Sequence, residues 1–175
     1  MNYWLLKSEP DTFSIDDLKK NKREVWSGVR NYQARNTIRD LMRVGEICFF
    51  YHSSCAVPAI VGLCKIVSEP YPDPTQFEKS PQPLFTKEGR SAKELEAYKK
   101  LWFCVDVEFV VKFEKIITLS EIKEIVETNN KNNRKEKSIL KDLKLIQKGS
   151  RLSVQPVTAE QANFILCYNR TNNGT

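Results

Sequence analysis

The sequence predicts an α+β fold in which a mostly antiparallel, curled sheet is flanked by helices. With 175 residues, the chain is long enough for one domain with a buried core. Strand and helix patterns do not alternate regularly, which argues against a doubly wound parallel sheet. Instead, apolar strand patterns at 46–51 and 59–67 lie on either side of a short polar turn, as in an antiparallel hairpin. Gly62 in the second pattern indicates a bulge or the close approach of another backbone.

The N-terminal part of the chain predicts one strand followed by two helices. Residues 3–6 form a short apolar run, as in a buried strand. Ser14, followed three residues later by Asp17, indicates the start of a short helix. Apolar residues recur at helical spacing over 32–42, and Gly45 then ends this second helix.

The remainder of the chain predicts a long loop, two strands and two helices. Residues 69–86 contain most of the eight prolines and cannot form a helix or a central strand. The pattern over 102–113 predicts the strongest strand of the chain. Capping boxes at 118–121 and 158–161 begin two helices. Residues 151–155 alternate as a last strand, which the following proline closes.

Positive charge is the main signal in the composition. The net charge of +6 and a pI near 9.0 favour an anionic partner, of which nucleic acid is the commonest. Between residues 131 and 151, eight lysines and arginines stand against two carboxylates. Part of this excess falls in a polar loop expected at 129–137, and a weakly helical segment is expected at 92–100. A solvated surface and a phosphate-binding face both fit such an excess.

The cysteines and acidic residues predict neither a metal site nor a redox site. The five cysteines are scattered without a Cys-x-x-Cys pair, as in a protein of a reducing compartment. Asp73, Asp106 and Glu108 are too weak a set for a metal site. No apolar run approaches membrane-spanning length and charges interrupt the N-terminus, so we expect no membrane contact and a cytosolic or nuclear location.

The candidate binding site lies in residues 25–36, which join an aromatic plane, short polar groups and two guanidiniums. Trp26 offers a stacking face, and Ser27 and Asn31 offer directional hydrogen bonds. Arg30 and Arg35 supply positive charge. We expect the segment from Trp26 to Asn31 to be a loop that opens into the second helix, where unsatisfied N–H groups favour an anion. The structural alternative is a core tryptophan, a turn and a solvated helix face.

Five stretches of the chain resemble the EVE-domain family, which includes thymocyte nuclear protein and bacterial relatives. The stretches are 4–10, 26–36, 49–54, 71–77 and 150–158. The resemblance implies a PUA-like fold, a small curled β-barrel with surrounding helices. It also implies one EVE domain over residues 1–169. Residues 170–175 are expected to form a frayed tail, as chain ends commonly do.

The EVE domain is related to the YTH domain, a reader of methylated adenine in RNA, and the resemblance implies an aromatic cage with Trp26 as one wall. Ser27 and Asn31 would then read the base edge. Two departures from the family stand out. Ala59 replaces the usual glycine after the hairpin proline, and the second cage tryptophan has no clear counterpart, which leaves Tyr71, Phe77 and Trp102 as candidates. The full set of expected base-binding residues is Trp26, Ser27, Asn31, Tyr32, Ser53, Ser54, Tyr71, Asp73, Phe77 and Trp102. The expected phosphate-binding residues are Lys7, Arg30, Arg35 and Arg151.

We therefore expect a non-catalytic module that reads a methylated or hydroxymethylated base, acts as a monomer and needs no cofactor. Modified DNA is the expected partner, with RNA as the second candidate. The location would be the cytoplasm of a bacterium or the nucleus of a eukaryote. One alternative is an enzyme acting on nucleic acid or a nucleotide through His52, Ser53 and Cys55. Another is a protein-interaction module whose pocket takes no base.

Overall fold

The computed structural model describes residues 1–77, 101–127 and 138–172. The helix expected at 92–100 and the loop expected at 129–137 lie outside these ranges, as do the second half of the proline-rich segment and residues 173–175.

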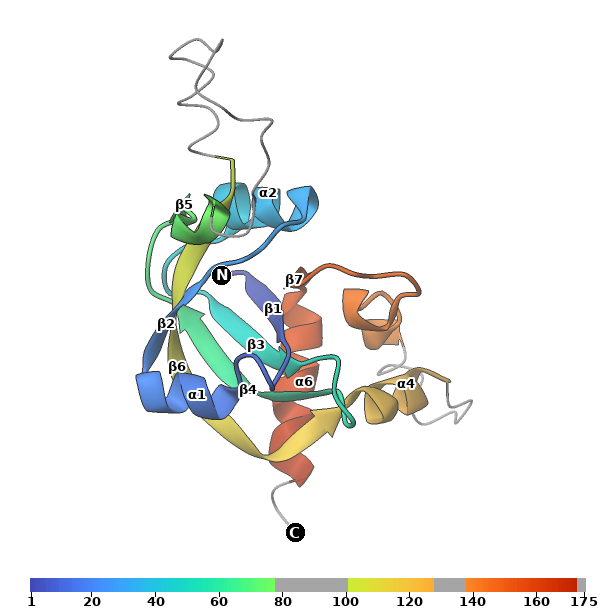
Figure 1. The fold of residues 1–175 in the computed structure, drawn as a ribbon. Coiled ribbons are helices and arrows are strands. Elements are labelled where there is room, and N and C mark those ends of the chain that lie inside the picture. Colours follow the sequence, from blue (N-terminus) through green and yellow to red (C-terminus); the bar gives the residue numbers. More distant parts are fainter. Residues whose placement is uncertain (78–100, 128–137, 173–175) are drawn as a thin grey trace, which may run out of the picture.

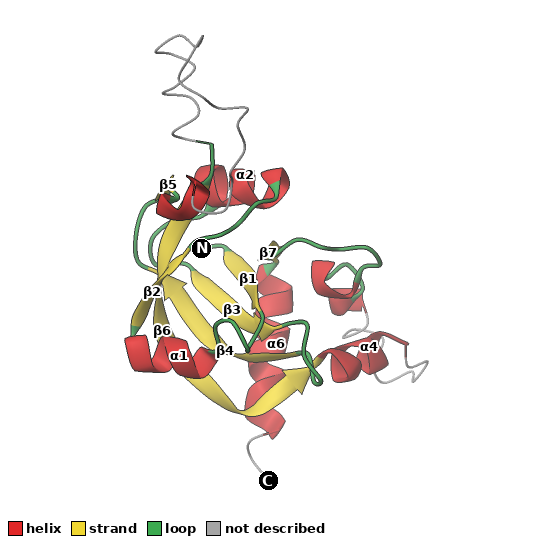
Figure 2. Cartoon of the chain, in the orientation of Figure 1, coloured by secondary structure: helices red, strands yellow, loops and turns green. Residues whose placement is uncertain are grey.

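A mostly antiparallel sheet forms the centre of the molecule, and the helices lie around it (Figures 1 and 2). The described strands are β1 (Tyr3–Ser8), β2 (Arg23–Trp26), β3 (Ile47–His52), β4 (Ala59–Ile66), β5 (Tyr71–Pro72), β6 (Phe103–Thr118) and β7 (Val154–Val157). Their order is β2-β6-β4-β3-β1-β7, with β5 added beside β6. Only the β1–β3 pair is parallel among these strands. The expected α+β fold is therefore confirmed.

The described helices are α1 (Ile15–Asn21), α2 (Tyr32–Leu41), α4 (Leu119–Glu127) and α6 (Ala159–Asn172), with short 3-10 turns η1 (Pro74–Phe77) and η4 (Lys144–Ile146). Three of the described α-helices begin at the predicted capping boxes, and α2 begins at residue 32, where the apolar spacing predicts it. Ser14 and Asp17 bond each other's backbone at the start of α1. The same reciprocal pattern precedes α4 and α6. Helix α6 continues to Asn172, into the segment expected to be a frayed tail.

Two apolar clusters cover the two faces of the sheet, because neighbouring strand residues point to opposite sides. Leu6 and Phe50 belong to the cluster covered by α1 and α2. Leu5 and Phe49, each one residue earlier, belong to the cluster covered by α4 and α6. Trp26 lies in the first cluster, so the candidate binding segment begins on the face of the sheet that α1 and α2 cover.

The hairpin and its glycine agree with the sequence analysis. Strands β3 and β4 pair antiparallel, and the register shifts next to Gly62. A Cβ atom at Gly62 would lie 2.3 Å from the carbonyl oxygen of Val111, so the close backbone approach is confirmed.

Two expectations about strand ends are wrong. Trp26 is the last residue of β2 rather than part of a loop, because its backbone pairs with Val105 of β6. Pro156 lies inside β7 instead of closing the strand. Its missing N–H is tolerated because β7 is the edge of the sheet and needs donors on one side only.

Candidate functional site

A pocket of about 330 Å³ opens beside Trp26. Four segments build it: Lys7 and Ser8 at the end of β1, the turn residues Thr12 and Phe13, residues 24–29, and Ser153. These segments lie far apart in the sequence and meet through the tertiary fold. The N–H of Lys7 donates to the carbonyl oxygen of Ser153, and the packing of Trp26 against Phe50 brings the end of β2 to the same place. The volume lies within the range of small-molecule pockets and suits a single planar group.

Trp26 belongs both to the pocket wall and to the core. Its side chain is 8% exposed, and its ring meets the ring of Phe50 edge to face, with centroids 5.5 Å apart. Packing of this kind fixes the indole before any ligand arrives. The pocket therefore has a preformed aromatic wall.

Phe13 is the second aromatic residue of the pocket, and the sequence analysis missed it. Its ring centroid lies 6.3 Å from that of Phe50. The available signal was its place directly before the N-cap Ser14, where an apolar residue commonly packs back against the helix. Tyr71 and Trp102 do not line this pocket, and the side chain of Phe77 lies outside the described part of the chain.

The polar groups of the pocket divide into committed and uncommitted groups. The Ser8 hydroxyl donates to the Phe13 carbonyl oxygen over 2.6 Å and so fixes the turn. Within the described part of the chain, the hydroxyls of Thr12, Ser27 and Ser153 make no hydrogen bond. They remain available to a ligand.

Glu24 is the one carboxylate among the described pocket residues. It stands two residues before Trp26 in β2, and the two side chains therefore share one face of the strand. Its Oε2 accepts a hydrogen bond of 2.9 Å from the amide of Asn21. Its Oε1 has no hydrogen-bond partner among the described residues.

Lys7 borders the pocket, with its ammonium group near Tyr51. The side chain leaves β1 on the face opposite Leu6, and Nζ lies 5.9 Å from the centroid of the Tyr51 ring. Burial lowers the pKa of the Lys7 ammonium from its ordinary value, because the charged form loses hydration.

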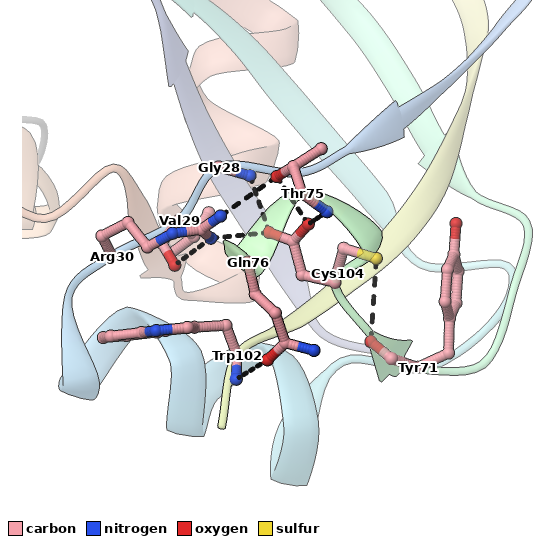
Figure 3. A network of polar contacts seen from close by, with 9 residues as sticks. Gly28, Val29, Arg30, Tyr71, Thr75, Gln76, Trp102 and Cys104 are labelled. Atoms are coloured by element: carbon pink, nitrogen blue, oxygen red, sulfur yellow. Dashed lines mark hydrogen bonds and ion pairs between the residues drawn. The ribbon is translucent and has the colours of Figure 1, made fainter. Parts of the chain in front are cut away.

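A buried carboxylate, Asp73, anchors the loop that follows β2. Figure 3 shows its donor residues Gly28, Arg30 and Thr75. It accepts hydrogen bonds from the N–H of Gly28 at 2.8 Å and from Arg30 Nη1 at 2.7 Å. The N–H and hydroxyl of Thr75 donate to its other oxygen, each at 2.7 Å. Burial opposes ionisation of Asp73, but these hydrogen bonds outweigh it, and its pKa lies below the ordinary value. Asp73 thus holds the pocket edge as a structural anion.

Arg30, Arg35, Tyr32 and Trp102 gather in a separate cluster outside the pocket. The rings of Tyr32 and Trp102 lie 5.0 Å apart at 30°. Arg30 lies over Trp102 at 5.7 Å from the ring centroid, and Arg35 lies over Tyr32 at 5.2 Å. Arg35 also donates to the carbonyl oxygen of Leu101 at 2.7 Å. The structure therefore gives both guanidiniums internal partners.

Asn31 and the hairpin-turn residues also have structural contacts. The Asn31 side chain caps α2 by accepting from the N–H groups of Gln33 and Ala34. Ser53 donates its N–H to the carbonyl oxygen of Ser8, and Ser54 is exposed. None of these residues lines the pocket.

The Tyr71 hydroxyl is hydrogen-bonded to Asp106, and Tyr71 does not line this pocket. The phenol donates to the Asp106 carboxylate. Burial, and then this hydrogen bond, raise the pKa of the Tyr71 phenol.

His52 serves as a backbone acceptor. Its Nε2 accepts from the N–H of Ile15 over 3.1 Å at the start of α1. Burial lowers the pKa of His52, which favours the unprotonated nitrogen that this hydrogen bond requires. No hydrogen bond joins His52 to Ser53 or Cys55 in the described part of the chain. The described residues also hold no group of three or more metal-ligating side chains and no helix long and apolar enough to cross a bilayer.

Comparisons with known proteins match this chain over almost its whole length. The family model for the EVE domain matches residues 2–168. Thymocyte nuclear protein 1 of Mus musculus is 44% identical over 181 residues, covering 97% of this chain and 74% of the relative. The Homo sapiens protein of the same name is 42% identical over 176 residues, covering 94% and 72%.

Solved structures show the same fold. A crystal structure of human THYN1 protein in complex with 5-methylcytosine containing DNA has a TM-score of 0.77 and 40% identity, covering 97% of this chain and 98% of that chain. A crystal structure of protein PSPTO5229 from Pseudomonas syringae has a TM-score of 0.74 and 44% identity, covering 95% and 99%.

Proposed function

Because the chain belongs to the EVE-domain family, we propose that it binds nucleic acid and reads a modified base in the pocket beside Trp26. The relative that was crystallised with 5-methylcytosine containing DNA supports modified DNA as the partner class. The observation that carries the proposal is a preformed pocket of about 330 Å³ with two aromatic walls and free hydroxyls. Binding here needs no bond-making chemistry, and the use of His52 as a backbone acceptor supports a non-catalytic role.

The expected energies set the size of the modification preference. Flipping a base out of a duplex costs a few kcal/mol. Stacking on an aromatic side chain returns about 1–3 kcal/mol. Removing one methyl group from water adds about 0.8 kcal/mol, or roughly a fourfold preference for the modified base. A larger preference needs hydrogen bonds that the modification or the base edge makes specifically.

Glu24 is suited to choose among bases. Cytosine presents an exocyclic amino group, which donates, where thymine presents a carbonyl oxygen, which accepts. A carboxylate oxygen such as Glu24 Oε1 stabilises the amino group and repels the carbonyl oxygen. We therefore assign Glu24 the reading of the amino group, while Ser27 bonds the rest of the base edge.

The test compares oligonucleotides that carry one 5-methylcytosine or one cytosine in the same sequence. The wild type should bind the modified strand several-fold more tightly, and Trp26→Ala should lose this preference. Because Trp26 is also in the core, Trp26→Phe serves as the variant that keeps an aromatic group and the fold. Trp102→Ala is the matched control, since Trp102 lies outside the pocket. Thermal unfolding checks that each variant is folded.

Two results would contradict the proposal. One is equal binding of both strands by the wild type, and the other is a folded Trp26→Ala protein whose preference is no lower than those of Trp26→Phe and Trp102→Ala. A mass change in either oligonucleotide after incubation with the protein would instead favour the enzyme alternative.

A further inference from the structure

A second hollow, which we call the basic groove, lies beside the pocket. It has a volume of about 350 Å³. Its described lining includes three cations, Lys144, Lys148 and Arg151, and no carboxylate. The amide side chains of Asn31, Gln33 and Gln147 complete its polar walls. A surface of this composition attracts an extended anion rather than a cation or an apolar segment.

The cations of the groove have few contacts of their own. The Lys144 ammonium donates to the side chain of Gln147 at 3.2 Å. None of the three cations forms an ion pair with a described carboxylate. Their charges are therefore available to a partner, unlike that of Arg30.

The backbone under these cations is fixed. Leu145 of η4 is buried in the second apolar cluster. The buried Gln155 donates to the Ser150 hydroxyl at 3.1 Å and to the carbonyl oxygen of Leu152 at 3.0 Å. Gly149, with φ of 78°, makes the turn between η4 and Ser150. The groove is thus a built feature of the fold.

The basic groove and the base pocket share an edge. Leu152 lines the groove and Ser153, the next residue, lines the pocket. On the other wall, Val29 lines the pocket and Asn31, two residues later, lines the groove. Neighbouring Cα atoms are about 3.8 Å apart, so the lining of the groove begins where the lining of the pocket ends.

We propose that the basic groove holds the phosphodiester backbone of the strand whose base enters the pocket. This inference rests on the proposed function and adds the path of the strand to it. Lys148 and Arg151 neutralise phosphates, and the amide groups of Gln33 and Gln147 donate to phosphate oxygens. The N-terminal end of α2, which Asn31 caps, adds a positive end of the helix dipole at the same wall.

The test measures how salt weakens binding. Removing one cation that neutralises a phosphate should reduce the slope of log K against log salt by about 0.7 for a single strand or 0.9 for a duplex. The variant Lys148→Gln/Arg151→Gln, which removes two such cations, should lower the slope by about 1.4 for a single strand or about 1.8 for a duplex. It should also lose affinity by one common factor for the modified and the unmodified strand. The control Lys115→Gln/Lys123→Gln removes the same charge from exposed positions outside the groove and should keep the wild-type slope.

The outcomes separate the groove from the pocket. A lower slope with an unchanged modification preference supports the groove. A slope equal to that of the control overturns it, and the base-reading function then stands if the preference remains. If the wild type has no preference, base reading fails, while a lower slope for the groove variant would still support a phosphate track. The inference is overturned if the groove variant binds an acidic peptide or a free nucleotide more weakly than the wild type does, but binds oligonucleotides equally well.

Discussion

The two halves of the segment 25–36 differ in what their side chains already contact. The first half, through Val29, lines an open pocket whose Ser27 hydroxyl has no partner in the described part of the chain. The second half begins with Arg30, which is held by a buried carboxylate, and continues into a helix that Asn31 caps. The residue types suggest ligand contacts throughout. The difference shows that existing partners decide which polar side chains a ligand can use.

The polar groups around the two halves also differ in the free energy that their removal from water costs. Asp73 is removed from water and is stable there only because several donors surround its charge. The hydroxyls of the pocket can bond to water in the open pocket, so leaving them without a protein partner carries little penalty. A ligand replaces that water. The first kind of group should therefore matter for stability and the second for binding.

The largest expected effect is on stability, from Asp73→Ala. The substitution leaves Arg30 and the N–H of Gly28 without their acceptor. Breaking a buried ion pair costs about 3–5 kcal/mol, and the lower end applies because Arg30 is 36% exposed. Urea unfolding measures the decrease in stability.

The control for this prediction is Asp40→Ala, which breaks the exposed pair between Arg39 and Asp40. Surface pairs contribute little, so this variant should stay close to the wild type. If Asp73→Ala were as stable as Asp40→Ala, the Asp73 network would not hold the pocket edge, and the comparison between the two halves would fail.

The next effect is on base choice, from Glu24→Gln. The amide keeps the shape and the possibility of accepting, but it loses the charge that favours an amino donor. The preference for 5-methylcytosine over thymine at the read position should fall by about 1–2 kcal/mol, or roughly fivefold to thirtyfold. Competition binding with matched oligonucleotides measures it.

Glu114→Gln is the matched control, because Glu114 is an exposed carboxylate of β6 outside the pocket. Both variants gain the same net charge, so a general rise in affinity for DNA should be common to them. A base preference that changes equally in both variants would refute a reading role for Glu24.

Local patterns predicted local structure well. The capping boxes, the hairpin and the close approach at Gly62 follow from residues within a few positions of one another, and each is confirmed. The parallel pairing of β1 with β3 brings together residues more than forty positions apart, and no short-range pattern carries that information.

The candidate site was predicted less completely, for the same reason. Trp26 is found where a ligand could reach it, but Phe13 and Ser153 join it only through the tertiary fold. Glu24 was missed because β2 was not expected to be a strand, so its alternation with Trp26 could not be seen. The internal partner of Arg30, Asp73, is 43 positions away in the sequence.

The smallest expected effect concerns pH and the turn that carries Phe13. His52 accepts from the N–H of Ile15, and this hydrogen bond requires an unprotonated Nε2. Because burial lowers the pKa of His52, the unfolded chain binds its proton more readily than the folded protein does. The stability from this group is therefore complete above about pH 6.5, the ordinary histidine value, and is lost as the pH falls below it. The variant His52→Gln keeps an acceptor but cannot titrate, so its free energy of unfolding should fall less between about pH 7 and pH 5.

Acidification should also reduce the modified-base preference of the wild type more than that of the variant, because Phe13 lies just before the helix that His52 holds. Equal pH profiles for the two proteins would show that the pocket does not depend on His52, and that the turn carrying Phe13 is held by its hydrogen bonds to Ser8 and Glu9 instead.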